Sequence, residues 1–179
     1  MNWGASTLAR EAMREFKFLI CGPHQSGKTT FMSNVVETFR PRQDFPETDY
    51  EPAQTADEFG TTEVAPGLKY LFYSSPSPRR FDFLWEVYAE NCSGYVFIVD
   101  STQPETFLEV RYALEHLLNY RSVPFIVAAN KQDLPDAFTH DLIANALHLD
   151  SSANVIPCIA IRKPSAQTAF EVLLKRVTI

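Results

Sequence analysis

The sequence lacks the features that mark several large classes of protein. It has no run of basic residues, and its net charge is −6, so neither nucleic acid nor an anionic membrane surface is expected as a partner. No apolar stretch approaches the roughly 20 residues that a membrane-spanning helix needs, so no stable membrane insertion is expected. Internal repeats and low-complexity segments are also missing, which favours an ordinary globular domain.

Cysteine is scarce, because the chain of 179 residues holds only Cys21, Cys92 and Cys158. Their spacing fits neither a zinc site nor a CxxC redox pair. Cys21 and Cys158 lie in apolar runs, so buried and reduced thiols are expected. An odd number of cysteines without a signal peptide predicts a cytoplasmic protein.

The sequence does contain apolar runs that alternate with stretches of helical periodicity. Buried strands are predicted at 16–21, 94–100, 124–130 and 155–161, and a hairpin at 58–64 and 68–73 around a Pro-Gly turn. Helices are predicted at 30–39, 81–92, 103–120, 140–147 and 166–177, with Ser101 or Thr102 capping the third and Ser165 capping the last. This order predicts an α/β fold of three layers, with a six-stranded, mostly parallel sheet, one antiparallel edge strand and helices on both faces.

The segment GPHQSGKT, which we call the phosphate loop (residues 22–29), matches the pattern GxxxxGK[ST]. A predicted strand precedes it and a predicted helix follows it, as in P-loop NTPases. Gly22 and Gly27 allow a tight turn, Lys28 supplies a charge to the β- and γ-phosphates, and Thr29 offers a hydroxyl to Mg²⁺. The remaining expected nucleotide contacts of this segment are His24, Gln25, Ser26 and Thr30.

A second motif, NKQD, follows the predicted strand at 124–130. Ligands bind beyond the carboxyl ends of strands in such sheets, so both motifs can reach one ligand. The carboxylate of Asp133 has only acceptors and suits the two neighbouring donors of guanine, whereas adenine would leave it unpaired. The stem of Lys131 can cover the base, and Asn130 can bond the base and the phosphate loop.

With these two motifs the chain resembles the Ras-like small GTPases over nearly its whole length. ARF-like members also carry NKQD, and the stretch from EFG through RRFDFLWE to GYVFIVDST is similar to bacterial Ras/ARF-like GTPases of the gliding-motility, MglA-type kind. The resemblance implies a G domain over 16–179 after an N-terminal extension (1–15), GTP or GDP with Mg²⁺ as ligands, and a regulatory or effector protein, possibly of the Roadblock type, as partner. It also implies a backbone contact from Ala160 to guanine, with Ile161 standing where the family has lysine.

The chain departs from this family at the second switch, where the family carries DxxGQ and this sequence has SSPSP at 74–78. Ser74 replaces the acid that orients Mg²⁺, Ser77 replaces the glycine that meets the γ-phosphate, and Pro78 replaces the glutamine that positions water. We therefore expect nucleotide binding with little intrinsic hydrolysis.

Replacement catalytic groups could come from His24, Arg79 or Arg80. His24 either crowds the attacking water or donates a hydrogen bond to phosphate. The second metal-binding hydroxyl is expected at Thr55, with Thr48, Thr61 and Thr62 as competitors. The expected function is a guanine-nucleotide switch or adaptor. The alternatives are an active GTPase completed by a partner and a structural pseudo-GTPase.

Overall fold

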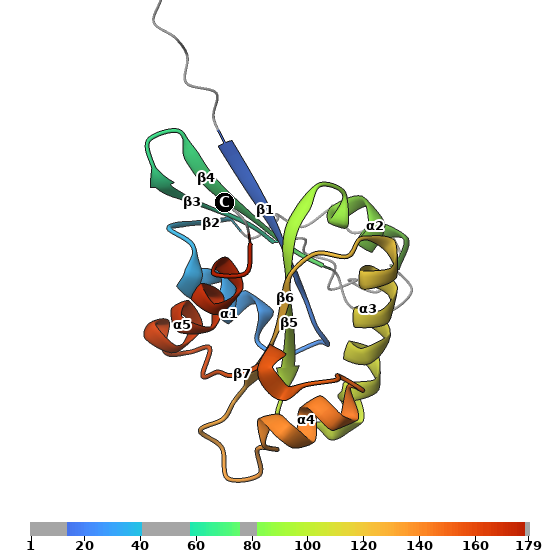
Figure 1. The fold of residues 1–179 in the computed structure, drawn as a ribbon. Coiled ribbons are helices and arrows are strands. Elements are labelled where there is room, and N and C mark those ends of the chain that lie inside the picture. Colours follow the sequence, from blue (N-terminus) through green and yellow to red (C-terminus); the bar gives the residue numbers. More distant parts are fainter. Residues whose placement is uncertain (1–13, 41–57, 76–81, 178–179) are drawn as a thin grey trace, which may run out of the picture.

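The structure is a computed structural model and describes residues 14–40, 58–75 and 82–177 (Figure 1). Within those residues, one sheet of seven strands has the order β2-β3-β4-β1-β5-β6-β7. The strands are β1 (Arg14–Cys21), β2 (Thr38–Arg40), β3 (Phe59–Ala65), β4 (Leu68–Ser74), β5 (Cys92–Asp100), β6 (Phe125–Asn130) and β7 (Val155–Pro157). The predicted α/β class, with a mostly parallel sheet, is confirmed.

The sheet differs from the prediction at its β2 edge. The described residues give seven strands rather than six, and the antiparallel strand β3 lies inside the sheet, between β2 and β4. The extra strand comes from residues predicted as the end of a helix. That helix stops at Val35 because Val36 takes an extended conformation, with φ −97° and ψ 154°. The chain then pairs Thr38 with Thr61 and covers the outer edge of β3.

Helices cover both faces of the sheet (Figure 1). One face carries α1 (Lys28–Val35) and α5 (Lys163–Leu174), and the other carries α2 (Asp82–Ala89), α3 (Phe107–Tyr120) and α4 (His140–Ala146). Among the helices of the described ranges, none combines the length and apolar character that crossing a membrane requires.

The predicted helix caps are wrong. A 3₁₀ turn, Pro104–Thr106, precedes α3, and the residue before that turn is Gln103 rather than Ser101 or Thr102. The Thr102 hydroxyl donates instead to Asp100. Ser165 lies inside α5, where its hydroxyl accepts a hydrogen bond of 2.9 Å from the N–H of Ile159. Short polar side chains before a helix bond to several local backbone groups, so sequence alone did not place these caps.

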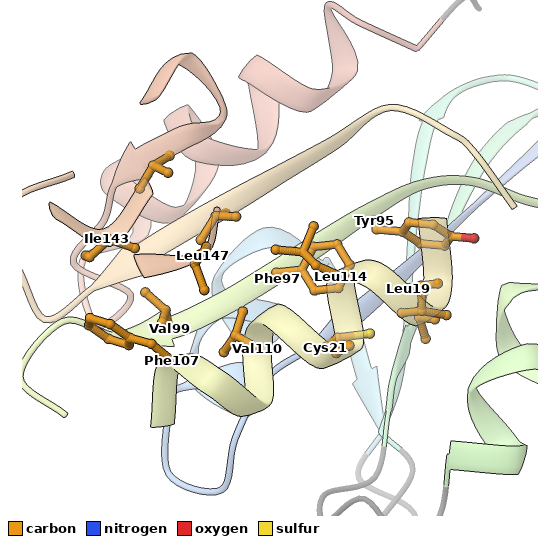
Figure 2. Close-up of a cluster of buried hydrophobic side chains, with 14 of the residues drawn as sticks. Leu19, Cys21, Tyr95, Phe97, Val99, Phe107, Val110, Leu114, Ile143 and Leu147 are labelled. Carbon is orange, nitrogen blue, oxygen red and sulfur yellow. The ribbon is translucent and has the colours of Figure 1, made fainter. Parts of the chain in front are cut away.

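Two apolar clusters hold the layers together. In Figure 2 the side chains of Phe107, Val110 and Leu114 on α3 lie against Phe97 and Val99 of β5. Burying each of these side chains contributes about 1.5–3 kcal/mol. The cluster on the other face packs α1 and α5 against the strands of the sheet, and it includes aromatic rings in edge-to-face contact.

The three cysteines are free and buried, as predicted. Burial raises the pKa of Cys21 and Cys92 to about 12 and that of Cys158 to about 11. The thiols therefore stay protonated at neutral pH, and they serve as small apolar side chains of the core.

Candidate functional site

The phosphate loop joins the end of β1 to the start of α1, at the lower end of the sheet in Figure 1. Gly27 has φ 103°, in the left-handed region that favours glycine. A Cβ at Gly27 would lie 2.3 Å from Asn130 Nδ2, and a Cβ at Gly22 would lie 2.3 Å from the carbonyl oxygen of Ile98 in β5. Both glycines are therefore required by close approach, and Gly27 also by its backbone angle.

Lys28 folds back over this loop. Its Nζ donates hydrogen bonds of 2.8 Å to the carbonyl oxygens of Gly22 and Pro23. Burial lowers the pKa of Lys28, and the neighbouring charge of Glu58 opposes that shift. A phosphate in the loop would offer this ammonium an acceptor of opposite charge in place of the two neutral carbonyl oxygens.

Asn130, the last residue of β6, ties the phosphate loop to the segment after β7. Its Nδ2 donates to the carbonyl oxygen of Ser26 at 2.8 Å, and its Oδ1 accepts from the N–H of Ala160 at 2.8 Å. Asn130 is buried, with 4% of its surface exposed. The Ala160 N–H, which the resemblance assigns to guanine, is thus bonded to Asn130 in this structure. Ile161 points outward and is 73% exposed.

The rest of NKQD lies at the surface beside Asn130. Lys131 has φ 64° and its Nζ bonds Asp100 Oδ2, which fixes its stem along this edge of the sheet. Gln132 donates from Nε2 to Ser101 Oγ at 2.8 Å. Asp133 is exposed, so its carboxylate is accessible to a ligand.

Asp100 is a buried carboxylate at the end of β5 that the sequence analysis did not select. Its Oδ1 accepts from the N–H and the hydroxyl of Thr102, at 3.0 and 2.7 Å, and its Oδ2 accepts from Lys131. Burial alone would raise the pKa of Asp100, but the hydrogen bonds from Lys131 and Thr102 outweigh it and hold that pKa below its usual value. The sequence feature that could have identified Asp100 is its position as an acidic residue at the end of the apolar run GYVFIVD.

Glu58 is a second buried carboxylate that the sequence analysis missed. It stands one residue before β3 and is 9% exposed. Thr29 donates its hydroxyl to Glu58 Oε1 at 2.5 Å, whereas Oε2 has no hydrogen-bond partner in the part of the chain that the structure describes. Burial raises the pKa of Glu58, while the hydrogen bond from Thr29 and the charge of Lys28 oppose the rise.

The oxygen atoms beside the phosphate loop suit Mg²⁺. The Thr29 hydroxyl and the Glu58 carboxylate are hard oxygen ligands, and magnesium in nucleotide sites takes one or two such groups and keeps phosphates and waters as its other ligands. Across residues 14–40, 58–75 and 82–177, no group of three or more His, Cys, Asp or Glu side chains gathers into a metal-binding cluster. The donor set therefore fits a magnesium ion shared with a nucleotide better than an all-protein cage.

The structure brings most of the predicted site residues to one edge of the sheet. Those that it joins there by hydrogen bonds or close approach are Gly22, Ser26, Gly27, Lys28, Thr29, Asn130, Lys131 and Ala160. His24, Gln25 and Asp133 are exposed, and Thr30 is half-buried. Thr61 and Thr62 lie in β3, where the Thr62 hydroxyl accepts from the N–H of Glu37 at 3.0 Å. The predictions for Thr48, Thr55, Ser77, Pro78, Arg79 and Arg80 fall outside the described residues.

Comparison with known proteins gives one matching family. The sequence profile of the ADP-ribosylation factor family matches residues 61–177. ADP-ribosylation factor-related protein 1 of Homo sapiens is 28% identical over 123 residues, which cover 67% of this chain and 61% of that protein. ADP-ribosylation factor K of Dictyostelium discoideum is 34% identical over 117 residues, which cover 62% of each chain. The phosphate loop precedes the residues that the profile matches, so its assignment depends on motif and geometry.

Among solved structures, the chain is similar to the Arl6 BBS3 small GTPase from Trypanosoma brucei with bound nucleotide analogue GppNp. The TM-score is 0.71 at 20% identity, over 90% of this chain and 96% of that one. At this level of identity the likeness establishes a shared fold.

Proposed function

The chain belongs to the ADP-ribosylation factor family, and on that premise we propose that it binds GTP and GDP and acts as a molecular switch or adaptor. The observation that carries the proposal is the pair of hydrogen bonds made by Asn130. They tie the phosphate loop at Ser26 to the segment at Ala160, so that residues after the ends of β1, β6 and β7 lie side by side. A purine nucleotide needs such an arrangement, because its base and its phosphates bind at opposite ends.

In this proposal each part of the site has one task. The N-terminus of α1 and the ammonium of Lys28 hold the phosphates, and Thr29 holds the magnesium ion. The exposed carboxylate of Asp133 accepts from the N1–H and N2 amine of guanine, and the stem of Lys131 lies along the base. Ile161 stands in place of the family's lysine and offers the base no charge of its own.

We further propose that intrinsic hydrolysis is weak. Ser74 and Pro78 stand where the family has the magnesium-orienting acid and the water-positioning glutamine. We propose that the protein is cytoplasmic and that the bound nucleotide, GTP or GDP, decides which protein partner it binds. A Roadblock-type protein is the proposed regulator or effector.

Binding of a fluorescent GDP analogue, with GTP and ATP as competitors, tests the main proposal. Lys28→Ala should weaken binding about 100-fold, because it removes a charge from the phosphates in a half-buried loop. Asp133→Asn should leave phosphate binding in place but reduce the preference for GTP over ATP by about 10-fold or more. Lys175→Ala and Asp136→Asn, which change exposed residues of the same types, serve as controls. If Asp133→Asn keeps the full preference, the base assignment is wrong.

Single-turnover hydrolysis of GTP tests the second proposal. Ras, which has the glutamine, hydrolyses GTP unaided at only about 3–5 × 10⁻⁴ per second. This protein should be slower than Ras when alone. Acceleration by a partner would identify an active GTPase that the partner completes, whereas faster unaided turnover than Ras would contradict weak intrinsic hydrolysis.

A further inference from the structure

We propose that Glu58 supplies the carboxylate of the magnesium site, in place of the acid that the family carries at the position of Ser74. The inference rests on the proposed nucleotide binding and adds a metal-binding residue from a different strand. The first observation is a missing carboxylate. Ser74, which is uncharged and 2% exposed, stands at the position where the family has an acid. The parallel register of β1 and β4 sets Ser74 beside Ile20, two residues before the phosphate loop.

The topology of the hairpin brings Glu58 to this position. Because β3 is antiparallel to β4, the start of β3 lies at the same edge of the sheet as the end of β4. The N–H of Ser74 donates to the backbone carbonyl of Glu58 at 2.9 Å, so the two residues are direct neighbours across the strands. A carboxylate lost from the end of β4 is thus replaced by one at the start of β3.

The side chain of Glu58 is directed at the metal-binding hydroxyl. Its Oε1 accepts from Thr29, the residue of the phosphate loop that offers a ligand to Mg²⁺, at 2.5 Å. Its Oε2 is buried and has no hydrogen-bond partner within the described ranges. A buried carboxylate oxygen without a partner is unfavourable, and a cation or its bound water would supply the missing interaction.

Glu58 should also make nucleotide binding depend on the metal. Without Mg²⁺, a carboxylate beside Thr29 repels the phosphates that the loop is built to hold. With Mg²⁺, the same carboxylate holds the ion that neutralises them. The affinity for nucleotide should therefore be low in a chelator and high in magnesium, and Glu58 should account for much of that ratio.

The test is the variant Glu58→Gln, which keeps the shape of the side chain and its acceptor for Thr29 but removes the charge. The dissociation constant of a fluorescent GDP analogue is measured in millimolar MgCl₂ and in EDTA for each protein. The ratio of the two affinities should fall about 10- to 100-fold, the usual effect of removing a group that holds a metal in place. Affinity in EDTA should rise, which simple damage to the site would not produce. Glu63→Gln, which changes an exposed carboxylate of β3, is the matched control and should keep the wild-type ratio.

The double variant Glu58→Gln, Ser74→Asp should restore the ratio, because it returns a carboxylate to the end of β4. If Glu58→Gln does not fold, as seen by circular dichroism, Ser74→Asp alone takes its place and should lower the magnesium concentration needed for half-maximal binding. A wild-type ratio in Glu58→Gln, or an unchanged magnesium requirement in Ser74→Asp, would overturn the inference. Equal affinity of the wild-type protein for GDP in magnesium and in EDTA would also overturn the inference, but it would leave the proposed nucleotide binding intact. Failure of the wild-type protein to bind GDP or GTP under any condition would reject both.

Discussion

Two carboxylates, Asp100 and Glu58, are buried at the same edge of the sheet and yet have opposite surroundings. Both oxygens of Asp100 are bonded, to Thr102 and to the ammonium of Lys131, and its pKa is lowered. Glu58 has one oxygen on the Thr29 hydroxyl and one without a partner in the described part of the chain, and burial raises its pKa. The first carboxylate has both oxygens bonded within the protein, whereas the second keeps one oxygen without a partner among the described residues, as the proposed magnesium site requires.

The same contrast separates the two sides of the site. On the β5 and β6 side, Asp100 and Asn130 have their hydrogen bonds satisfied by the fold, and they position the segments that would hold the base. On the side of β3 and the phosphate loop, Glu58 Oε2 and Ser26 Oγ are buried without partners among the described residues. Buried polar groups are nearly always paired, so these two oxygens beside the phosphate loop agree with the proposed nucleotide and magnesium site.

Asn130→Ala should show the largest loss of stability on the satisfied side. It leaves the carbonyl oxygen of Ser26 and the N–H of Ala160 buried without a partner, at about 1–3 kcal/mol each. We expect the free energy of unfolding in urea to fall by about 3 kcal/mol. Asn145→Ala, an exposed residue of α4, should change it by less than about 0.5 kcal/mol. Equal effects in both variants would show that Asn130 does not tie the segments together.

Asp100→Asn should have a smaller effect. The amide can still accept from Thr102, but it loses the ion pair with Lys131, whose side chain is 32% exposed. We expect a loss of about 2 kcal/mol at neutral pH, because hydrogen bonds to a buried charged carboxylate are replaced by weaker ones to a neutral amide. The measurement is urea unfolding of the variant and the wild-type protein side by side, with Asp136→Asn as the control for an exposed aspartate.

The pH dependence of that loss gives an independent check. Because the folded-state pKa of Asp100 lies below its unfolded value of about 3.9, its contribution is complete above about pH 5. It disappears as the pH falls through the folded-state pKa, where the wild-type carboxylate becomes neutral as well. The difference between wild type and Asp100→Asn should therefore shrink as the pH falls from about 5 through the folded-state pKa. A difference that stays constant over this range would mean that the charge of Asp100 is not the source of the stability.

The sequence was sufficient to predict the layers of the fold and the elements that carry the motifs. Continuous apolar runs such as 94–100 and 124–130 have one stable arrangement, as central strands of a sheet covered on both faces. The pattern GPHQSGKT likewise predicted a tight turn at Gly22 and Gly27. Their close approach to Ile98 and Asn130 explains why no side chain is tolerated there.

The features that sequence analysis missed depend on pairing between distant segments. Thr38–Arg40 has the local pattern of a helix end and becomes a strand only because β3 offers an open edge. Glu58 is an ordinary acid in its local sequence. The pairing of β3 with β4 reveals its position. Phe59 pairs with Tyr73, so the next residues along the two strands, Glu58 and Ser74, are neighbours, and Ser74 stands where the family has an acid.

Glu58→Gln should have the smallest effect on stability. It tests directly whether Glu58 differs from Asp100 in having no structural role. If Glu58 is kept for a ligand, its charge contributes nothing to folding in the absence of nucleotide, and its burial is unfavourable. The variant should then match the wild type or exceed it by up to about 1 kcal/mol in the free energy of unfolding, measured in EDTA without nucleotide. Adding Mg²⁺ and GDP should reverse the order, because only the wild-type protein gains the full stabilisation of tight binding. A loss in EDTA as large as that of Asp100→Asn would show that the two carboxylates have the same structural role.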